Sequence, residues 1–415
     1  MARARSLGLA AFVAAPLAIA LMADRTQSLR RDPPELRADS SIAVVSSRDA
    51  GGGTLREAIT AAARTRGRVR ITIAPSRITL LSPLPPVVNA DGVVFDAMDS
   101  HCEIDASGIG NVPALLISSP GSAVSGLRFR NARDAAILVN APNVFLRDVA
   151  VRDSTDGIVL TAARGTIVER ASLERNTNGV RLDDTSPGTV IRGCTFRSHD
   201  GAGIWAVTGT PRGGTATRIE NNTFRDDRVS VVIANLGASL TGNDIRGALE
   251  NGVYTMQSRT IMRTNRILRS AGSGIVGDRV DGLVLERNEI DHNAAVGILI
   301  RSCRTASVQN NVVYANAYGI ASVFGDRGAP NVIAGNVVTG NRLDGIFLIG
   351  SSPLLRGNRL LQNGAAAARV LDFVPLTGAR IPSDPRFDNN TLRGNKLDAA
   401  VKGEYRPPPE KVKPQ

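Results

Sequence analysis

The sequence has few cysteines, histidines, lysines and aromatic residues, and these shortages exclude several classes of protein. Its cysteines, Cys102, Cys194 and Cys303, are too few, too scattered and odd in number for a disulfide framework. We expect them to be buried as small apolar side chains. The 3 histidines show no metal site of ordinary spacing, which also disfavours a metal-delivery protein.

Positive charge is in excess and is carried almost entirely by arginine. The net charge is +12, and the few lysines all lie near the carboxyl end. Such an excess suggests an anionic partner. Outside the cytoplasm this partner is an acidic polysaccharide or a lipid headgroup rather than nucleic acid. The alternative is a compositional drift towards arginine with no partner behind it.

The first 23 residues have the layout of a secretory signal peptide. Arg3 and Arg5 precede an apolar run from Leu7 to Ala23, which ends in small residues suited to a signal peptidase. The run of about 17 residues is at the lower limit for spanning a bilayer, so an uncleaved membrane anchor is the alternative. No other apolar run is long enough to span, and we expect no membrane span after leader cleavage.

Two sequence markers recur with a common period of about 22 residues. The first is a Gly before a β-branched and an apolar residue, with Ser230 in one place: Gly157, Gly179, Gly203, Gly252, Gly274, Gly297, Gly319 and Gly345. The second is an Asn two residues before an apolar one: Asn222, Asn243, Asn265, Asn288, Asn311, Asn336 and Asn358. Two markers with one period indicate a solenoid.

The elements inside each repeat are short strands rather than helices. Apolar residues alternate over short spans, as in "GIVL" and "GVRL", and Gly and Asn punctuate them where we expect positive φ or side-chain-to-backbone bonds. Stacked repeats would pair each strand with its counterpart one turn away. The sequence therefore predicts an all-β, single-stranded, right-handed parallel β-helix of about a dozen turns, with the asparagines stacked in a ladder.

The pattern resembles the right-handed parallel β-helix proteins of the pectate-lyase-like superfamily. The stretch "AGGGTLREAITAAARTRGRVRITIAP" (50–75) is similar to the opening of secreted members, in which a short amphipathic helix caps the first turn. We expect a linker over 24–40, the β-helix over 41–398 with this capping helix near 54–65, and a disordered or loosely packed tail over 399–415. The resemblance implies that a substrate cleft lies over the sheet built from the glycine-led strands.

Alternate residues of the glycine-led strands point outward, and most of these are apolar. We expect loops, the tail or a second copy of the chain to cover part of this face. Polar and aromatic residues gather in the middle: Arg181, Asp183, Trp205 and Tyr254 on strands, Asp184 just past its strand, and His199 and Asp200 in the next loop. This cluster is the predicted site.

The residue types of this cluster suit chemistry on acidic sugars. In β-elimination, Arg181 would neutralise a uronate carboxylate, while His199 or Tyr254 would remove or supply a proton. A glycosidase would instead use two carboxyl groups, and a calcium ion would fit the same aspartates: Asp183, Asp184 and Asp200. Trp205 and Tyr254 would bind sugar rings. The alternative is that "DD" and "SHDG" have only a structural role and form turns.

The motifs depart from the known enzymes that the resemblance suggests. "SHDG" replaces the Gly-His-Gly of polygalacturonases, and no Arg-x-Lys follows. The Asp-Pro-His-Glu signature of β-helix alginate epimerases is absent, and the repeats contain no lysine to act as the base of some pectate-lyase relatives. The sequence therefore does not identify the glycan or the bond.

A second surface is predicted from arginines three residues past the asparagine position. Arg197, Arg225 and Arg246 would stack about 4.8 Å apart and bind carboxylates or sulfates of an extended glycan. The alternative is that aspartates nearby, such as Asp244, neutralise them. Together these features predict an exported protein that acts on an acidic polysaccharide by lyase-type β-elimination. The alternatives are a non-catalytic polysaccharide-binding scaffold and a glycoside hydrolase.

Overall fold

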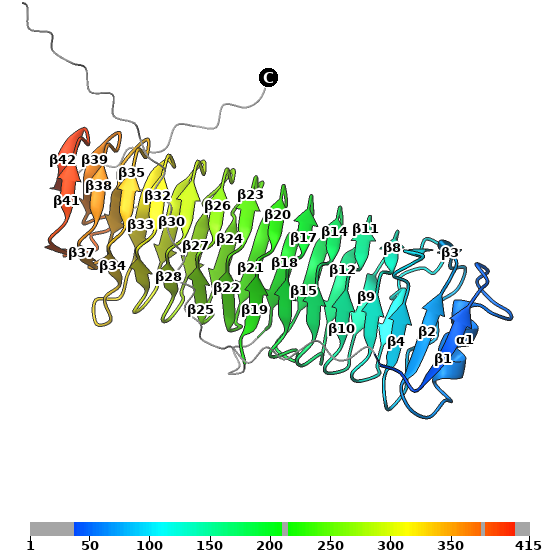
Figure 1. Ribbon diagram of the computed structural model, residues 1–415. Helices are drawn as coiled ribbons and strands as arrows, with labels where there is room; N and C mark the ends of the chain where they lie inside the picture. Colours follow the sequence, from blue (N-terminus) through cyan, green and yellow to red (C-terminus); the bar gives the residue numbers. More distant parts are fainter. Residues whose placement is uncertain (1–36, 210–214, 375–377, 403–415) are drawn as a thin grey trace, which may run out of the picture. The chain divides into compact units, whose positions relative to one another are not determined.

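The computed structural model describes residues 37–209, 215–374 and 378–402. The chain forms a coil of three parallel sheets, A, B and C (Figure 1). From β4 onward it visits sheets A, B and C in that order on every turn. Sheet C has 13 strands, which confirms the predicted parallel β-helix of about a dozen turns.

Sheet A consists of β1 Ser40–Val44, β2 Val69–Ile73, β4 Val93–Asp96, β7 Ala123–Ser125, β10 Phe145–Arg147, β13 Ile167–Glu169, β16 Val190–Arg192, β19 Thr217–Glu220, β22 Ala238–Thr241, β25 Thr260–Arg263, β28 Val284–Glu286, β31 Ser307–Gln309, β34 Val332–Ala334, β37 Leu354–Arg356 and β40 Arg386–Asp388.

Sheet B consists of β3 Arg77–Thr79, β5 Glu103–Asp105, β8 Arg128–Arg130, β11 Ala150–Arg152, β14 Ser172–Glu174, β17 Thr195–Arg197, β20 Thr223–Arg225, β23 Asp244–Arg246, β26 Arg266–Leu268, β29 Glu289–Asp291, β32 Val312–Tyr314, β35 Val337–Thr339, β38 Arg359–Leu361 and β41 Thr391–Arg393.

Sheet C consists of β6 Leu115–Ile117, β9 Ala135–Val139, β12 Asp156–Leu160, β15 Asn178–Leu182, β18 Ala202–Val207, β21 Val229–Ala234, β24 Val253–Met256, β27 Ile275–Asp278, β30 Val296–Arg301, β33 Tyr318–Val323, β36 Ile346–Ile349, β39 Ala366–Leu371 and β42 Leu397–Lys402.

The predicted capping helix is α1, Leu55–Ala62, which packs against β1 and β2. Thr54 starts it, because its hydroxyl oxygen accepts a hydrogen bond from the Glu57 amide at 3.3 Å. The Glu57 carboxylate in turn accepts one from the Gly53 amide. Leu55 and Ile59 turn to the coil and are buried, so the helix covers apolar core at the first turns.

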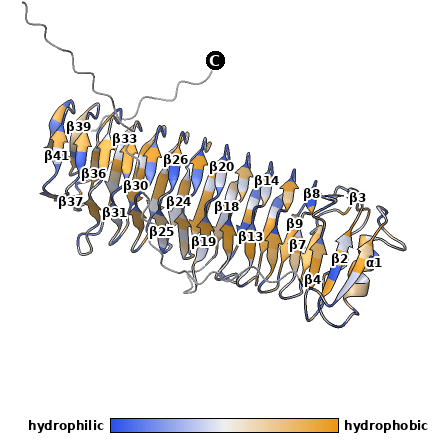
Figure 2. Ribbon diagram, viewed as in Figure 1, coloured by the Kyte–Doolittle hydropathy of each residue, from blue (hydrophilic) through white to orange (hydrophobic). Residues whose placement is uncertain are grey.

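The coil encloses one continuous hydrophobic core, and hydrophobic residues recur in the strands of every turn (Figure 2). Phe196 and Phe224 stack within it, with ring centroids 4.6 Å apart and planes 7° apart. All three cysteines are free and buried, as expected. Burial raises the pKa of Cys102 and Cys194 to about 12 and that of Cys303 to about 11, so these thiols are not nucleophiles.

The recurring glycines are required by close approach between turns, which corrects the expectation of positive φ. A Cβ on Gly179 would lie 2.5 Å from the carbonyl oxygen of Gly203 and 2.7 Å from the Phe196 ring. The glycines that lead the strands of sheet C have no positive φ. Positive φ occurs instead at turn residues, many of them not glycine, such as Arg175 and Ser198.

The predicted asparagine ladder runs along the turn between sheets A and B. Asn243 donates its side-chain NH₂ to Asn265 Oδ1 at 2.9 Å and to the Ile219 carbonyl at 2.8 Å. Asn265 Oδ1 also accepts the Asn243 backbone amide at 3.0 Å. The same bonds link Asn222, Asn243, Asn265, Asn288, Asn311, Asn336, Asn358 and Asn390.

A second ladder, which was not predicted, follows the turn between sheets B and C. It links Asn293, Asn316, Asn341, Asn363 and Asn395 through the same side-chain bonds. These asparagines recur at nearly the same period as the first set, so the signal was present in the sequence. His199 and Asp227 occupy the equivalent position in two earlier turns of the coil, after β17 and β20. This position directs their side chains into the coil.

The predicted ends of the chain are only partly described. The signal peptide at 1–23 lies outside the described residues, as do 24–36 of the expected linker and 403–415 of the expected tail. The coil begins at Ser40, and β42 extends to Lys402, into the region expected to be a loose tail. Within the described residues no helix is long and apolar enough to cross a membrane.

Candidate functional site on the outer face of sheet C

The outward row of sheet C matches the alternation predicted from the sequence. Register pairs connect Arg181 on β15 to Trp205 on β18, and Val232 on β21 to Tyr254 on β24. The whole row reads Leu138, Val159, Arg181, Trp205, Val232, Tyr254, Val276, Leu299, Ala321, Phe347 and Arg369. Its polar and aromatic members in mid-coil are therefore Arg181, Trp205 and Tyr254.

Arg181 and Trp205 line one small hollow of about 70 Å³ together with Asp183, Val159 and Val207. The Trp205 side chain is one of the few large apolar groups that stay exposed, at 38%. Arg181 is also exposed, so a planar ring and a guanidinium group are offered side by side to a ligand. We call this the Trp205 hollow.

Arg181 is held in place by an aspartate of the preceding turn. Its Nε donates to Asp156 Oδ2 at 2.8 Å, and Asn178 donates to the other oxygen of Asp156 at 2.9 Å. The Asp156 side chain is only 8% exposed, whereas that of Arg181 is 46% exposed. The carboxylate therefore anchors the base of the guanidinium group and leaves its terminal nitrogens facing outward.

An arginine held by an aspartate of the preceding turn also occurs near the carboxyl end of the coil. Arg369 Nε donates to Asp344 at 2.8 Å, and both side chains are largely buried. In each case the Asp precedes the leading glycine, as in "DGIVL" and "DGIFL", and the arginine follows 25 residues later. Asp156 was missed in the sequence, and this repeated spacing is the signal that could have found it.

His199 does not lie on the surface as predicted. It is 1% exposed and points into the coil, where its Nδ1 is 2.6 Å from Asp227 Oδ1. The reason is local: Ser198 takes a positive φ, and the residue after such a turn residue occupies a ladder position inside the coil. The described structure therefore gives His199 no access to a polysaccharide.

The aspartates of the predicted site also fail to converge. Asp183, at the end of β15, accepts hydrogen bonds from the amide and hydroxyl of Thr185, and Asp184 is half-buried beside it. Asp200 precedes β18 and lies at the opposite end of the strand pair, because Leu182 is in register with Ala206. The separation is at least about 15 Å at the usual rise per residue.

This separation bears on the expected calcium site. Asp183, Asp184 and Asp200 cannot share one ion across that distance. Within residues 37–209, 215–374 and 378–402 no group of three His, Cys, Asp or Glu side chains could hold a metal ion.

A second polar group on sheet C surrounds Tyr254. The tyrosine hydroxyl donates to Asp278 Oδ2 at 3.3 Å, and Arg301 binds both oxygens of the same carboxylate at 3.2 and 2.8 Å. Burial and then the negative charge of Asp278 raise the pKa of Tyr254. Burial alone would raise the pKa of Asp278, but Arg301 outweighs it and the pKa is lowered. The Tyr254 hydroxyl therefore keeps its proton at neutral pH and donates it in a hydrogen bond to Asp278.

The arginine row predicted on a second surface exists on sheet B. Arg197, Arg225 and Arg246 are register partners on β17, β20 and β23. Arg225 and Arg246 both bind Asp244, at 2.9 and 2.8 Å. Burial would raise the pKa of Asp244, but the hydrogen bonds from Arg246 and Arg225 outweigh it and lower the pKa. Two of the three cations therefore share a single carboxylate, which cancels one of their two positive charges, and Arg197 is exposed.

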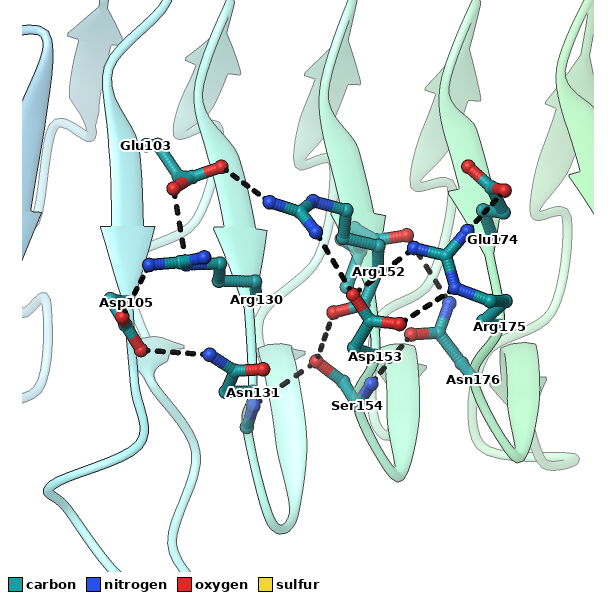
Figure 3. Close-up of polar contacts among 12 residues, drawn as sticks. Glu103, Asp105, Arg130, Asn131, Arg152, Asp153, Ser154, Glu174, Arg175 and Asn176 are labelled. Atoms are coloured by element: carbon teal, nitrogen blue, oxygen red, sulfur yellow. Dashed lines mark hydrogen bonds and ion pairs between the residues drawn. The ribbon is translucent and has the colours of Figure 1, made fainter.

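Charge pairing is denser still at the amino-terminal end of sheet B (Figure 3). Arg152 bridges Glu103 on one side and Asp153 on the other, each at 3.0 Å. Arg175 in turn forms an ion pair with Asp153, with its Nε 2.8 Å from Asp153 Oδ1. Such a chain of alternating charges ties successive turns together and leaves little net charge for a ligand. Sheet B is accordingly a weaker candidate for binding than sheet C.

Apolar positions at the carboxyl end of sheet C form their own cluster. Tyr318, Phe347 and Ile349 are buried there although they point out of the coil. Leu371 and Phe373, at the end of β39 and just beyond it, pack on the same cluster. The chain itself therefore covers part of this face, as expected, while cover by a second copy stays a prediction.

Comparison with known proteins places the chain in a family. The family model described as "Right handed beta helix region" matches residues 88–212 and 210–365. The chain belongs to this right-handed β-helix family, in agreement with the handedness predicted from the repeat. A search among curated proteins gave no match.

Several solved structures are similar to the chain at low identity. The periplasmic alginate epimerase AlgG is 14% identical, with 81% of this chain and 75% of that chain covered and a TM-score of 0.42. The AlgE4 A-module, a mannuronan C-5 epimerase of Azotobacter vinelandii, is 13% identical, with 89% and 98% covered and a TM-score of 0.46. Tailspike protein 3 of bacteriophage CBA120 is 15% identical, with 84% and 60% covered and a TM-score of 0.47. These likenesses concern the fold alone.

Proposed function

We propose that this protein is an exported β-helix protein that binds an acidic polysaccharide on the outer face of sheet C. The observation that carries the proposal is the pairing of Arg181 with Trp205, which are register partners and line the same hollow. An indole face packs against the apolar face of a sugar ring, and a guanidinium group recognises a carboxylate through two parallel hydrogen bonds. A uronate residue offers both features within one ring.

The geometry supports binding better than turnover at the Trp205 hollow. Of the predicted catalytic set, only Arg181 and Asp183 line this hollow. His199 is buried in the coil, and Asp200 lies at the other end of the strand. The hollow therefore offers a cation, a ring platform and one carboxylate, but not an acid and a base on either side of a bond.

The test is calorimetric titration of the protein with polygalacturonate and alginate, and with neutral dextran. We expect the two uronate polymers to bind and dextran not to bind. Trp205→Ala should weaken binding by about 2 kcal/mol, roughly thirtyfold in Kd, as for a central aromatic contact. Arg181→Gln should weaken binding too, and Arg359→Gln, at an exposed arginine of sheet B, is the matched control for that loss of charge. Equal binding by wild type and Trp205→Ala would place the polysaccharide elsewhere.

Lyase-type β-elimination is the second candidate function, and the group around Tyr254 is the observation that favours it. Tyr254 could protonate the leaving oxygen, and Arg301 could neutralise a carboxylate. The carboxylate of this group, Asp278, is buried and has both oxygens bound by Arg301, so it is not free to accept the C5 proton. For this reason binding is the first proposal. Unsaturated product, followed by its absorbance, would establish the lyase, and Tyr254→Phe should abolish it. New reducing ends without that absorbance would indicate a hydrolase.

Export is inferred from the amino-terminal sequence, with Arg3 and Arg5 before the apolar run from Leu7 to Ala23. It places the protein in the periplasm or outside the cell, or on the inner membrane if the leader stays attached. Fractionation of cells that express the full chain, with detection of the mature amino terminus, tests this part of the proposal.

A further inference from the structure

A larger hollow of about 580 Å³ lies three strands further along the coil, at the turn between sheets C and A. Its lining residues are Gln257, Ser258, Arg259, Arg279, Asp281, Gly282 and Thr305. We call it the turn hollow. It belongs neither to the Trp205 hollow nor to the charge network of sheet B.

The hollow arises from one extra residue in the turn. Met256 on sheet C is in register with Asp278, and Ile261 on sheet A is in register with Val284. The chain advances five residues from Met256 to Ile261, but six from Asp278 to Val284. The longer turn, with Arg279 and Gly282 both at positive φ, no longer stacks on the shorter one. The step between the two turns leaves a recess that faces outward.

Positive charge dominates the recess. Arg259 is exposed, and within the described residues it has no ion-pair partner. Arg279 is 3.6 Å from Asp278, whose two oxygens are already bound by Arg301 at 2.8 and 3.2 Å. The one acidic residue of the lining, Asp281, accepts a hydrogen bond from Thr305 at 3.1 Å. The guanidinium groups of Arg259 and Arg279 thus line one recess and offer N–H donors to a ligand in it.

The two hollows lie along the same edge of sheet C. Val207 lines the Trp205 hollow, and the register leads from it through Ala234 and Met256 to Asp278, which directly precedes Arg279. Three strand steps correspond to about 14 Å. The positions of this register row between the two hollows, Ala234 and Met256, are small or apolar, so an extended chain could cross them without burying an unpaired charge.

We propose that the turn hollow is a second anion subsite, in which Arg259 and Arg279 bind a carboxylate of the same uronate chain that occupies the Trp205 hollow. This inference rests on the proposed function. A polymer long enough to reach both hollows gains from the second contact, because that contact is made at a high effective concentration. A fragment too short to span about 14 Å occupies only one of them.

The experiment compares digalacturonate with dodecagalacturonate in calorimetric titrations of wild type and of the double variant Arg259→Gln, Arg279→Gln. Glutamine is tolerated at position 279, because Gln257 already occupies the equivalent positive-φ position one turn earlier. We expect the double variant to lose about tenfold or more in affinity for the long oligomer and to bind the dimer at the Trp205 hollow as wild type does. The matched control, Arg263→Gln with Arg287→Gln, removes two arginines from sheet A and the turn after it.

The outcomes separate the two proposals. If wild type binds neither oligomer, the proposed function itself fails. If wild type binds the long oligomer and the double variant binds it equally well, only the second subsite is wrong. An equal loss for dimer and dodecamer, or the same loss in the control, would also overturn the subsite, because the arginines would then act through general charge.

Discussion

The His199 imidazole and the Asp227 carboxylate form a pair with fully buried side chains, with Nδ1 and Oδ1 2.6 Å apart. They stand in the ladder between sheets B and C, where later turns have asparagine. Asp227 Oδ1 also accepts the backbone amide of His199 at 3.2 Å, as an asparagine oxygen does. Its second oxygen has no hydrogen-bond partner among the described residues, and it occupies the place where asparagine has a donor.

Asp227→Asn should therefore stabilise the coil. An asparagine at position 227 could donate to the carbonyl of Phe196, which lies three residues before His199. Asn316 makes the equivalent bond at 3.1 Å to the carbonyl of Ile290, which lies three residues before Asn293. Satisfying the orphaned position should raise the free energy of unfolding at pH 7 by about 1–3 kcal/mol, measured in urea. Asp200→Asn, an exposed neighbour, is the control. A destabilised Asp227→Asn variant would show that the carboxylate serves as an ionic partner of His199.

The same pair predicts a pH dependence. Burial raises the pKa of Asp227, and the hydrogen bond from His199 offsets only part of this. The folded protein then keeps a proton that the unfolded chain loses near its ordinary pKa of about 3.9. The contribution of Asp227 to the free energy of unfolding is thus full below that pH and falls as pH rises towards the raised pKa. The difference in stability between Asp227→Asn and wild type should grow over this range.

Asn288→Leu should destabilise the middle of the coil. The asparagine donates to the Met262 carbonyl and to Asn311 Oδ1, each at 3.0 Å, and accepts from Asn265 at 2.9 Å. Leucine has a similar size but leaves these buried groups unsatisfied, at a cost of about 1–3 kcal/mol or more. Urea unfolding measures the loss. Asn140→Leu, at an exposed asparagine outside the ladders, is the control, and equal midpoints for both variants would show that the ladder contributes nothing.

Asp156→Asn should strengthen polysaccharide binding. The substitution removes the negative charge that Arg181 Nε contacts at 2.8 Å. The amide oxygen can still accept that hydrogen bond, while the bond from Asn178 to the other oxygen is lost. The gain should be about 1 kcal/mol or less, roughly fivefold or less in Kd, because Arg181 is half exposed and solvent screens the charge. It should disappear at high salt. Weaker binding by Asp156→Asn would mean that Arg181 needs the carboxylate to hold it in place more than it gains from losing the charge.

The repeat could be read from the sequence because its causes are local and recur. Each leading glycine meets the backbone of the next turn, and each asparagine of the first ladder bonds the one after it. The outward row containing Arg181, Trp205 and Tyr254 then followed from alternation alone.

The site was predicted less well because its residues depend on where each turn bends. His199 looked like a loop residue, but the positive φ of Ser198 turns it into the coil. Asp200 is near Trp205 in sequence, yet the strand that separates them carries it to the far end. Asp156, missed in the sequence, meets Arg181 only through stacking of neighbouring turns, which a single repeat does not reveal.

The measurement that tests the central claim most directly is the fluorescence of Trp205 during titration with polygalacturonate. Trp205 is the only tryptophan of the chain, so its emission reports on this one hollow. A ligand stacked on the ring should shift and change the emission in a saturable way, with the calorimetric Kd, and Arg181→Gln should weaken the response. High salt should weaken it too, because Arg181 is exposed. Saturable binding by calorimetry with unchanged Trp205 emission would contradict the assignment of the site.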